Sequence, residues 1–143
     1  MKRILYFTVI LAVVCGLAGC EKKDCNGDLD GMWQLTEWKN SQGTVMATRE
    51  SMIFYSFQLQ MMNFKKLTEP SLNINSSFRY AADGIQVYDP VIYIGGGHDQ
   101  IQEMSVLGPL GVPADGLMKI ESLSPGELVL SSATQGVLKF RKY

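Results

Sequence analysis

The fold is decided by residues 72–87, which read LNINSSFRYAADGIQV. Apolar or small side chains stand at every second position: Leu72, Ile74, Ser76, Phe78 and Tyr80. The positions between them are polar, and such alternation predicts a β-strand that is buried on one face. Asp83-Gly84 follows, a dipeptide typical of tight hairpins, and Ile85 and Val87 begin the return strand. This stretch therefore predicts an antiparallel hairpin.

The same alternation recurs on both sides of the hairpin. The further predicted strands are residues 29–40, 51–64, 91–94, 116–121, 128–130 and 137–143. Residues 51–64 are the longest, and a helix competes there because Phe57, Met61 and Phe64 also fit helical spacing. Their enrichment in Tyr, Phe and Ile favours a strand. Asp89-Pro90 is expected to break the return strand before residue 91.

One longer connection interrupts the strands. Ile101, Met104 and Leu107 suit one or two helical turns, so we predict a short helical connection near residues 99–107. Eight strands with otherwise short connections are typical of a β-sandwich or a barrel. We predict an all-β fold, an eight-stranded antiparallel up-and-down β-barrel, because closure removes exposed strand edges.

The amino-terminal residues predict export and lipid attachment. Lys2-Arg3 precedes an apolar run that ends at Gly19-Cys20, and charged residues follow at once. This order is typical of a secretory signal peptide, and a cysteine after the cut marks its bacterial lipoprotein variant. We predict a signal peptide over residues 1–19, lipidation of Cys20 by fatty acyl chains such as palmitate, and a flexible spacer over residues 20–28. A transmembrane anchor is the alternative, but residues 4–19 number 16, short of the roughly 20 that a spanning helix needs.

The composition of residues 20–143 fits one domain held at a membrane through the lipid on Cys20. The whole chain has 13 Lys and Arg against 14 Asp and Glu, and removal of Lys2 and Arg3 leaves 11 against 14. This balance, without a basic patch, argues against nucleic acid as a partner. With Cys20 lipidated and Cys15 removed, Cys25 has no partner in its own chain and is either a free thiol or a bridge between chains.

No residue set in the sequence predicts catalysis or a metal site. His98 is the single histidine, and the sequence holds no serine-elbow motif that would supply a nucleophile beside it. One histidine without a cysteine cluster is not a transition-metal site. Residues 95–97 are glycines without the Lys-Ser/Thr of a phosphate-binding loop, so they predict a turn. We therefore expect no enzyme activity, no metal and no cofactor.

Three short motifs resemble a known family. They are Leu29-Asp30-Gly31-Met32-Trp33, Leu128-Val129-Leu130 and Phe140-Arg141-Lys142-Tyr143. Gly31-Met32-Trp33 matches the Gly-x-Trp signature of lipocalins, and the whole pattern resembles lipocalin-like domains of bacterial outer-membrane lipoproteins over residues 29–143. The Thr-Asp-Tyr motif and long carboxy-terminal helix of true lipocalins are absent.

The resemblance implies a closed barrel end and a location. Gly31 and Trp33 would close one end of the barrel, and a basic residue near the last strand, Arg141 or Lys139, would pack over Trp33. The chain would be lipid-anchored in the outer membrane, on its periplasmic face or at the cell surface. Trp38 has the opposite strand parity from Trp33, so it is expected to face outward unless a bulge intervenes.

Two functions follow as hypotheses. Methionine and aromatic residues are common on surfaces that bind apolar ligands, so the barrel is expected to hold a small apolar or amphipathic ligand. The alternative is a filled barrel that acts as a non-catalytic structural or interaction subunit of a cell-envelope complex. An internal cavity lined by Met and aromatic residues favours the first hypothesis. A solid interior, with an exposed apolar patch around Trp38 or residues 98–115, favours the second.

Overall fold

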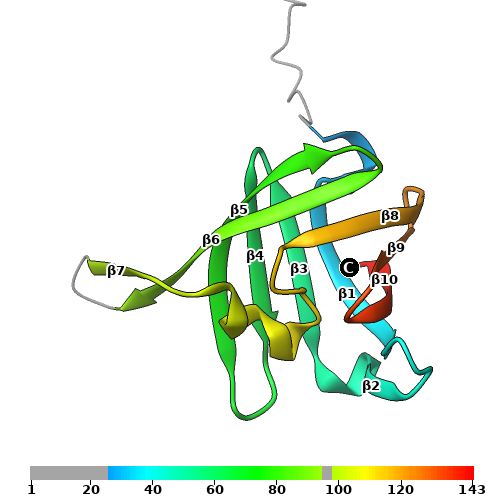
Figure 1. Ribbon diagram of the computed structural model, residues 1–143, viewed down its shortest axis with the longest axis horizontal. Helices are drawn as coiled ribbons and strands as arrows, with labels where there is room; N and C mark the ends of the chain where they lie inside the picture. Colours follow the sequence, from blue (N-terminus) through cyan, green and yellow to red (C-terminus); the bar gives the residue numbers. More distant parts are fainter. Residues whose placement is uncertain (1–25, 95–97) are drawn as a thin grey trace, which may run out of the picture.

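The computed structural model describes residues 26–94 and 98–143, which form one sheet with three short 3₁₀ turns (Figure 1). The strands are β1 (Gly31–Lys39), β2 (Val45–Thr48), β3 (Ile53–Gln58), β4 (Met61–Lys66), β5 (Leu72–Ala81), β6 (Gly84–Ile94), β7 (His98–Ile101), β8 (Leu117–Leu123), β9 (Glu127–Ser132) and β10 (Gly136–Lys142). The 3₁₀ turns are η1 (Gly27–Leu29), η2 (Arg49–Ser51) and η3 (Met104–Leu110).

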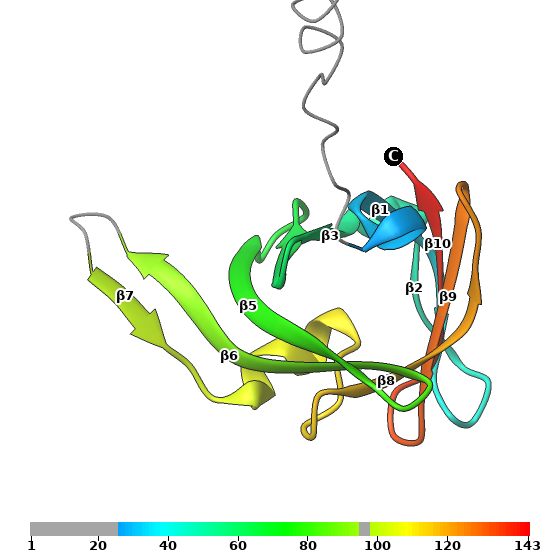
Figure 2. The same ribbon diagram turned by 90° about the horizontal axis from the view of Figure 1, so that it is seen from above.

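The sheet closes into a barrel. Its order is β10-β9-β8-β6-β5-β4-β3-β1, and β10 also pairs with β1, so eight antiparallel strands form a complete ring. The remaining two strands are attached to the ring, with β2 beside β1 and β7 beside β6. The predicted eight-stranded up-and-down barrel is confirmed. Figure 2 shows β6 and β7 running outward together, away from the ring.

The eight strands of the ring are not divided along the chain as predicted. Residues 51–64 contain two strands, β3 and β4, because Leu59 adopts a left-handed backbone (φ 56°) and turns the chain between them. Conversely, Asp89-Pro90 does not break β6. Asp89 has φ 50°, and one extra residue is accommodated opposite Ser77 and Asn75, so a β-bulge keeps β6 continuous.

The β5–β6 hairpin uses its glycine differently from the prediction. Ala81 pairs with Gly84, which leaves Ala82-Asp83 as the two-residue loop. Gly84 is the first residue of β6 and lies against β8, where a Cβ would come 2.0 Å from the Met118 carbonyl oxygen. Gly84 therefore permits close contact between strands instead of forming the turn.

The predicted helical connection begins later than expected. Residues 98–101 form β7, and the helical part is η3, which ends at Gly111 in the left-handed conformation (φ 90°). Leu107 and Leu110 of η3 are fully buried. The connection therefore contributes to the core as well as linking β7 to β8.

Trp38 faces inward, contrary to the parity of the strand. Between Leu35 and Glu37 the pairing with β10 advances by one residue only, so Thr36 is an extra residue in β1. This bulge reverses the side on which later side chains fall. Trp38 is 5% exposed, and its indole donates a hydrogen bond to the Gln135 carbonyl at 2.6 Å.

Candidate functional site

Trp33 lies beneath η1 at one end of the barrel, which we call the Trp33 end. Its side chain is fully buried, and its indole N–H donates a hydrogen bond to the Leu29 carbonyl at 2.8 Å. Leu29, at the end of η1, is buried as well. Asp30 follows η1 and leads the chain into β1, so η1 and the start of β1 cover this end, at the top of Figure 1.

The basic residue over Trp33 is Lys142. Its ammonium lies 4.2 Å from the centroid of the Trp33 ring and donates hydrogen bonds to the carbonyls of Asp28 (2.8 Å) and Asp30. Gly31 has φ 114°, and a Cβ there would come 3.2 Å from the Lys142 side chain. Gly31 thus leaves room for the lysine that joins η1 to β10.

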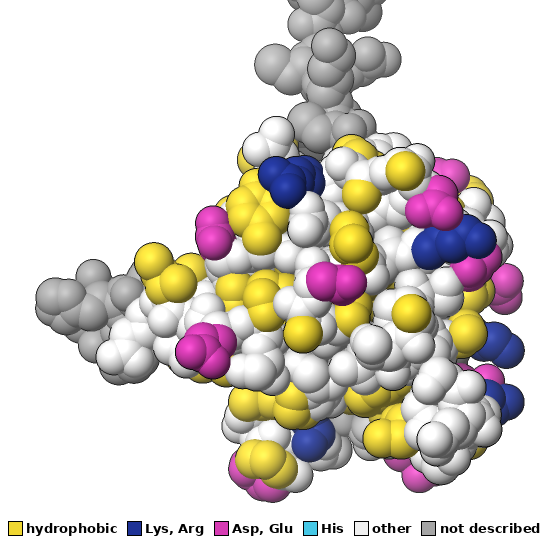
Figure 3. Space-filling view, in the orientation of Figure 1, with side chains coloured by type: hydrophobic (Ala, Val, Ile, Leu, Met, Phe, Trp, Pro, Cys, Tyr) yellow, Lys and Arg dark blue, Asp and Glu magenta, His cyan; other side chains and the backbone are white. Residues whose placement is uncertain are grey.

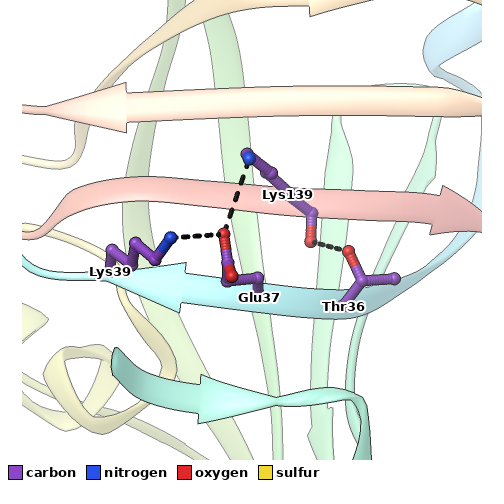
Figure 4. A network of polar contacts seen from close by, with 4 residues as sticks. All are labelled: Thr36, Glu37, Lys39 and Lys139. Carbon is purple, nitrogen blue, oxygen red and sulfur yellow. Dashed lines mark hydrogen bonds and ion pairs between the residues drawn. The ribbon is translucent and has the colours of Figure 1, made fainter. Parts of the chain in front are cut away.

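Neither Arg141 nor Lys139 takes the predicted place over Trp33. Successive side chains of a strand point to opposite faces, and Arg141 donates to the side-chain oxygen of Gln34 at 3.2 Å instead. Lys139 lies on the outer surface, where the Glu37 carboxylate pairs with Lys139 (3.5 Å) and Lys39 (3.3 Å), as Figure 4 shows. The hydrogen bond from Lys39 is the main cause that lowers the pKa of the Glu37 carboxyl.

Side chains fill the barrel interior. Tyr55 lies between Phe64 and Phe140, with ring centroids 4.7 and 4.6 Å apart, and Phe57 meets Phe78 edge to face at 5.5 Å. All five rings are at most 3% exposed. Contacts at these distances leave no room for a ligand between the rings.

The opposite end of the barrel is covered by η3, shown in yellow in Figure 1. The Tyr55 hydroxyl donates a hydrogen bond to the Leu110 carbonyl, and burial raises the pKa of this phenol. The buried hydroxyl therefore stays protonated and ties η3 to β3. Val112, just after η3, is buried too.

A groove lies on the rim at the Trp33 end. It has a volume of about 700 Å³ and is lined by Asn26 and residues 59–61 on one side and residues 77–80 on the other. We call it the rim groove. Leu59, Met61 and Tyr80 are 58%, 49% and 57% exposed, whereas Phe78 beneath them is buried. An apolar floor with partly apolar walls suits the tail of an amphiphile.

Polar contacts fix the shape of the rim groove. The Asn26 side-chain amide donates to the Leu59 carbonyl at 2.7 Å, and the Tyr80 hydroxyl donates to the Asn26 side-chain oxygen at 3.0 Å. Partial burial, and next the charge of Asp30, raises the pKa of Tyr80, so the phenol keeps the proton that it donates. The β3–β4 turn, β5 and the start of the described chain are thereby held together.

The alternation of residues 72–80 did not predict this groove. It places Tyr80 on the same face as Phe78, and Ile74, Ser76 and Phe78 are indeed buried. Pairing with β4 ends at Ser77, however, so β5 continues past its neighbour and Tyr80 lies at the rim. The groove could have been predicted from the greater length of β5 than of β4. That difference in length was hidden because the turn at Leu59 was not recognised.

Two smaller hollows lie elsewhere on the surface. One, of about 480 Å³, lies between the β5–β6 turn, the start of β8 and the β9–β10 turn. The other, of about 350 Å³, lies beside η1 and Lys142 and is also lined by Asp28, Asp30 and Pro125. The face of the molecule seen in Figure 3 carries apolar side chains dispersed among polar ones, with acidic and basic groups interspersed. The rim groove is larger than either hollow.

Several predicted positions lie outside the described part of the chain. Cys20 and Cys25 both precede residue 26, and the side chain of His98 is not described although its backbone begins β7. Within residues 26–94 and 98–143, no three His, Cys, Asp or Glu side chains are grouped to hold a metal ion. None of the helical segments described is long and apolar enough to cross a membrane.

Comparison with known proteins agrees with this geometry. A lipocalin-like protein from Bacteroides uniformis is similar in structure, with a TM-score of 0.59 and 24% identity over 82% of this chain and 100% of that one. An uncharacterized protein from Bacteroides eggerthii gives a TM-score of 0.56 and 22% identity over 80% of this chain and 99% of that one. Both likenesses establish the fold alone. Curated proteins give no match. The lipocalin-like domain family matches residues 15–143, nearly the whole chain, and the chain belongs to that family.

Proposed function

We propose that this chain is a lipid-anchored, non-catalytic binding module that takes a small apolar or amphipathic ligand in the rim groove. The observation that carries the proposal is the groove itself, about 700 Å³ with a Phe78 floor and exposed Leu59 and Met61. Small-molecule sites have volumes of roughly 300–1,000 Å³ and are mostly apolar with a few polar groups. The filled interior argues for the rim, not the lumen, as the place of binding.

The anchoring part of the proposal rests on the sequence. Lys2-Arg3, the apolar run and Gly19-Cys20 together form the pattern of a lipoprotein signal. Two or three acyl chains on Cys20 would hold the domain at a membrane permanently, since about 0.8 kcal/mol is gained per buried CH₂. The mass of the mature chain tests this directly. We expect it to begin at Cys20 and carry acyl chains, and Cys20→Ala to leave the membrane fraction.

Binding is tested on the Cys20→Ala chain produced without residues 1–19, with a fluorescent fatty acid as the probe. Met61→Lys places a charge at the groove wall and should weaken binding at least tenfold, because about 1.4 kcal/mol lost from an apolar contact equals a factor of ten. Val45→Lys is the matched control, since Val45 is 51% exposed in β2, against 49% for Met61. Equal affinities for the two variants would exclude the rim groove as the binding site.

A second candidate function is a structural or interaction subunit with a filled barrel. The observation that favours it is β7, which among the described strands pairs only with β6 and ends in Ile101, 79% exposed. An unpaired edge with an exposed apolar residue suits addition of a strand from another protein. Ile101→Lys should then release a stoichiometric partner that copurifies with the acylated chain. Val45→Lys should retain that partner.

A further inference from the structure

The groove wall contains an apolar residue in a conformation that costs free energy. Leu59 adopts φ 56°, where a residue with a Cβ is disfavoured by about 1–2 kcal/mol relative to glycine. Its side chain is 58% exposed, so burial within this chain does not offset that cost. The turn between β3 and β4 therefore displays a leucine to the outside at the lip of the rim groove.

The rim groove lies where the chain reaches the lipid anchor. Asn26 lines the groove and is bonded to both of its sides, and six residue steps separate it from Cys20. A chain spans at most about 3.3–3.6 Å per residue, so the acylated cysteine lies within about 20 Å of Asn26. The surface of any bilayer that holds these acyl chains therefore also lies within about 20 Å of Asn26, at the edge of the groove.

The opposite end of the barrel can face the anchoring bilayer only with the tether fully extended, so the tether favours the groove end. Gly31 of β1 pairs with Phe57 near the groove, whereas Lys39, eight residues on, pairs with Val137. At about 3.3 Å per residue these points are roughly 26 Å apart. Strands of an eight-stranded barrel are tilted by about 35–45°, so the two ends are about 18–21 Å apart along the barrel axis, and a barrel with its Val137 end on the membrane would need a fully extended tether.

A cation stands beside the apolar wall. Arg79 lines the rim groove, and its guanidinium donates to the Gln86 side-chain oxygen at 2.6 Å and lies 5.5 Å from the centre of the Tyr88 ring. Among the described residues no carboxylate forms an ion pair with it. A guanidinium with free positive charge suits the phosphate of a lipid headgroup.

From these observations we propose that the rim groove faces the anchoring bilayer and seats an acyl tail of one of its phospholipids, with the headgroup phosphate at Arg79. The inference rests on the proposed function, because it assumes lipidated Cys20 and a groove that accepts an amphiphile. It adds the source and class of the ligand. Phospholipid reaches the groove from the membrane without crossing water.

The test places tryptophan in the groove of the full mature chain. Met61→Trp and the control Val137→Trp, 49% and 39% exposed in the parent, are isolated with their acyl groups. Each is reconstituted in phosphatidylethanolamine–phosphatidylglycerol vesicles whose phospholipids carry brominated acyl chains. Trp33 and Trp38 give both variants the same background. We expect at least a twofold greater fractional quenching for Met61→Trp than for Val137→Trp.

The possible outcomes separate this inference from the proposed function. Equal quenching, or stronger quenching of Val137→Trp, overturns the inference, and so does quenching of Met61→Trp that Leu59→Trp fails to reproduce. A partner protein or a water-borne ligand in the groove would likewise leave both tryptophans unquenched. If the mature mass shows no acyl chain, the proposed anchoring fails before any vesicle is made. An acylated chain that binds fatty acid but escapes quenching contradicts the inference alone.

Discussion

Lys142, in β10, holds η1 and the start of β1 together at the Trp33 end. Its ammonium lies over Trp33 and donates to carbonyls at both ends of the η1–β1 junction, those of Asp28 and Asp30. Hydrogen bonds from a charged donor contribute about 1.5–3 kcal/mol, and a cation over an aromatic ring contributes about 0.5–2 kcal/mol. These interactions attach the amino-terminal cover to the last strand.

Lys142→Met should therefore lower the free energy of unfolding by about 1.5–3 kcal/mol, measured by urea denaturation of the Cys20→Ala chain. Lys139→Met is the control, because the Lys139 side chain is 55% exposed and forms a surface ion pair with Glu37. Its effect should stay within about 0.5 kcal/mol. A control variant as unstable as Lys142→Met would show that the carbonyl and ring contacts are not the cause.

The motif predicted the kind of residue over Trp33 but not its position. The closing sequence offers Lys139, Arg141 and Lys142, and strand parity relative to Trp33 decides among them. The bulge at Thr36 lies beyond Trp33 in β1 and leaves this choice unaffected, because Trp33 pairs directly with Lys142. Lys142 has the same parity as the buried Leu138 and Phe140, so the alternation of the last strand favoured it over Lys139 and Arg141, and the family motif alone did not use that signal.

Glu37 gives a pH dependence of known sign. The Lys39 contact, ahead of the smaller effects of Lys139, lowers the pKa of Glu37 below its ordinary value of 4.5. A lowered folded-state pKa stabilises the fold above the unfolded-state pKa, and that contribution disappears as the pH falls through the folded-state pKa. Below about pH 4.5, the ordinary value of the carboxyl, the parent should lose stability more steeply than Glu37→Gln. Because the group is exposed, about 1 M NaCl should bring the two profiles together.

At the scale of elements, glycine decides how closely two strands approach. The β6–β8 pairing begins at Gly84 opposite Lys119, and a Cβ on Gly84 would lie 2.0 Å from the Met118 carbonyl oxygen. Backbone cannot move aside as a side-chain tip can, so β6 and β8 would have to separate. The closed ring depends on this pairing, because among the described strands it joins the β5–β6 hairpin to the β8–β9 hairpin.

Gly84→Ala should destabilise the barrel by about 1–3 kcal/mol, the usual cost of overpacking. Gly126→Ala is the matched control. Gly126 lies in the β8–β9 turn, has no positive φ, and has no heavy atom within 4 Å of the position that a Cβ would take. Thermal unfolding of both variants checks the prediction. A Gly84→Ala variant as stable as the parent would mean that β8 can shift without loss of unfolding free energy. Hydrogen exchange at the amides of β8 would then report the new pairing.

Element boundaries were missed where no turn residue marks them, and one was predicted wrongly where strand pairing overrides a turn signal. Alternation identified every strand of the ring except the division of residues 51–64. That division depends on Leu59 in a left-handed conformation, which leucine rarely adopts, so no turn residue announces it. Asp89-Pro90 is the opposite case. It reads as a break, yet the bulge at Asp89 retains it within β6 because the flanking residues still pair with β5.

At the scale of the molecule, the proposed binding site is separate from the core that stabilises the barrel. Phe140 lies in the filled interior, 3% exposed and 4.6 Å from the Tyr55 ring centre, whereas Met61 lies on the rim and contributes little to the core. If the ligand lay inside the barrel, stability and binding would be coupled, because a substitution that enlarges the core would also enlarge the binding site. A ligand held at the rim keeps them independent.

Phe140→Ala should therefore cost about 3–5 kcal/mol of unfolding free energy, the usual result of removing a buried aromatic ring. At a temperature where the variant stays folded, its affinity for the fluorescent fatty acid should equal that of the parent Cys20→Ala chain. Met61→Lys should show the reverse, with stability changed by no more than about 0.5 kcal/mol and binding reduced at least tenfold. If Phe140→Ala instead alters binding while Met61→Lys does not, the ligand enters the lumen, and the packed aromatic rings must part to admit it.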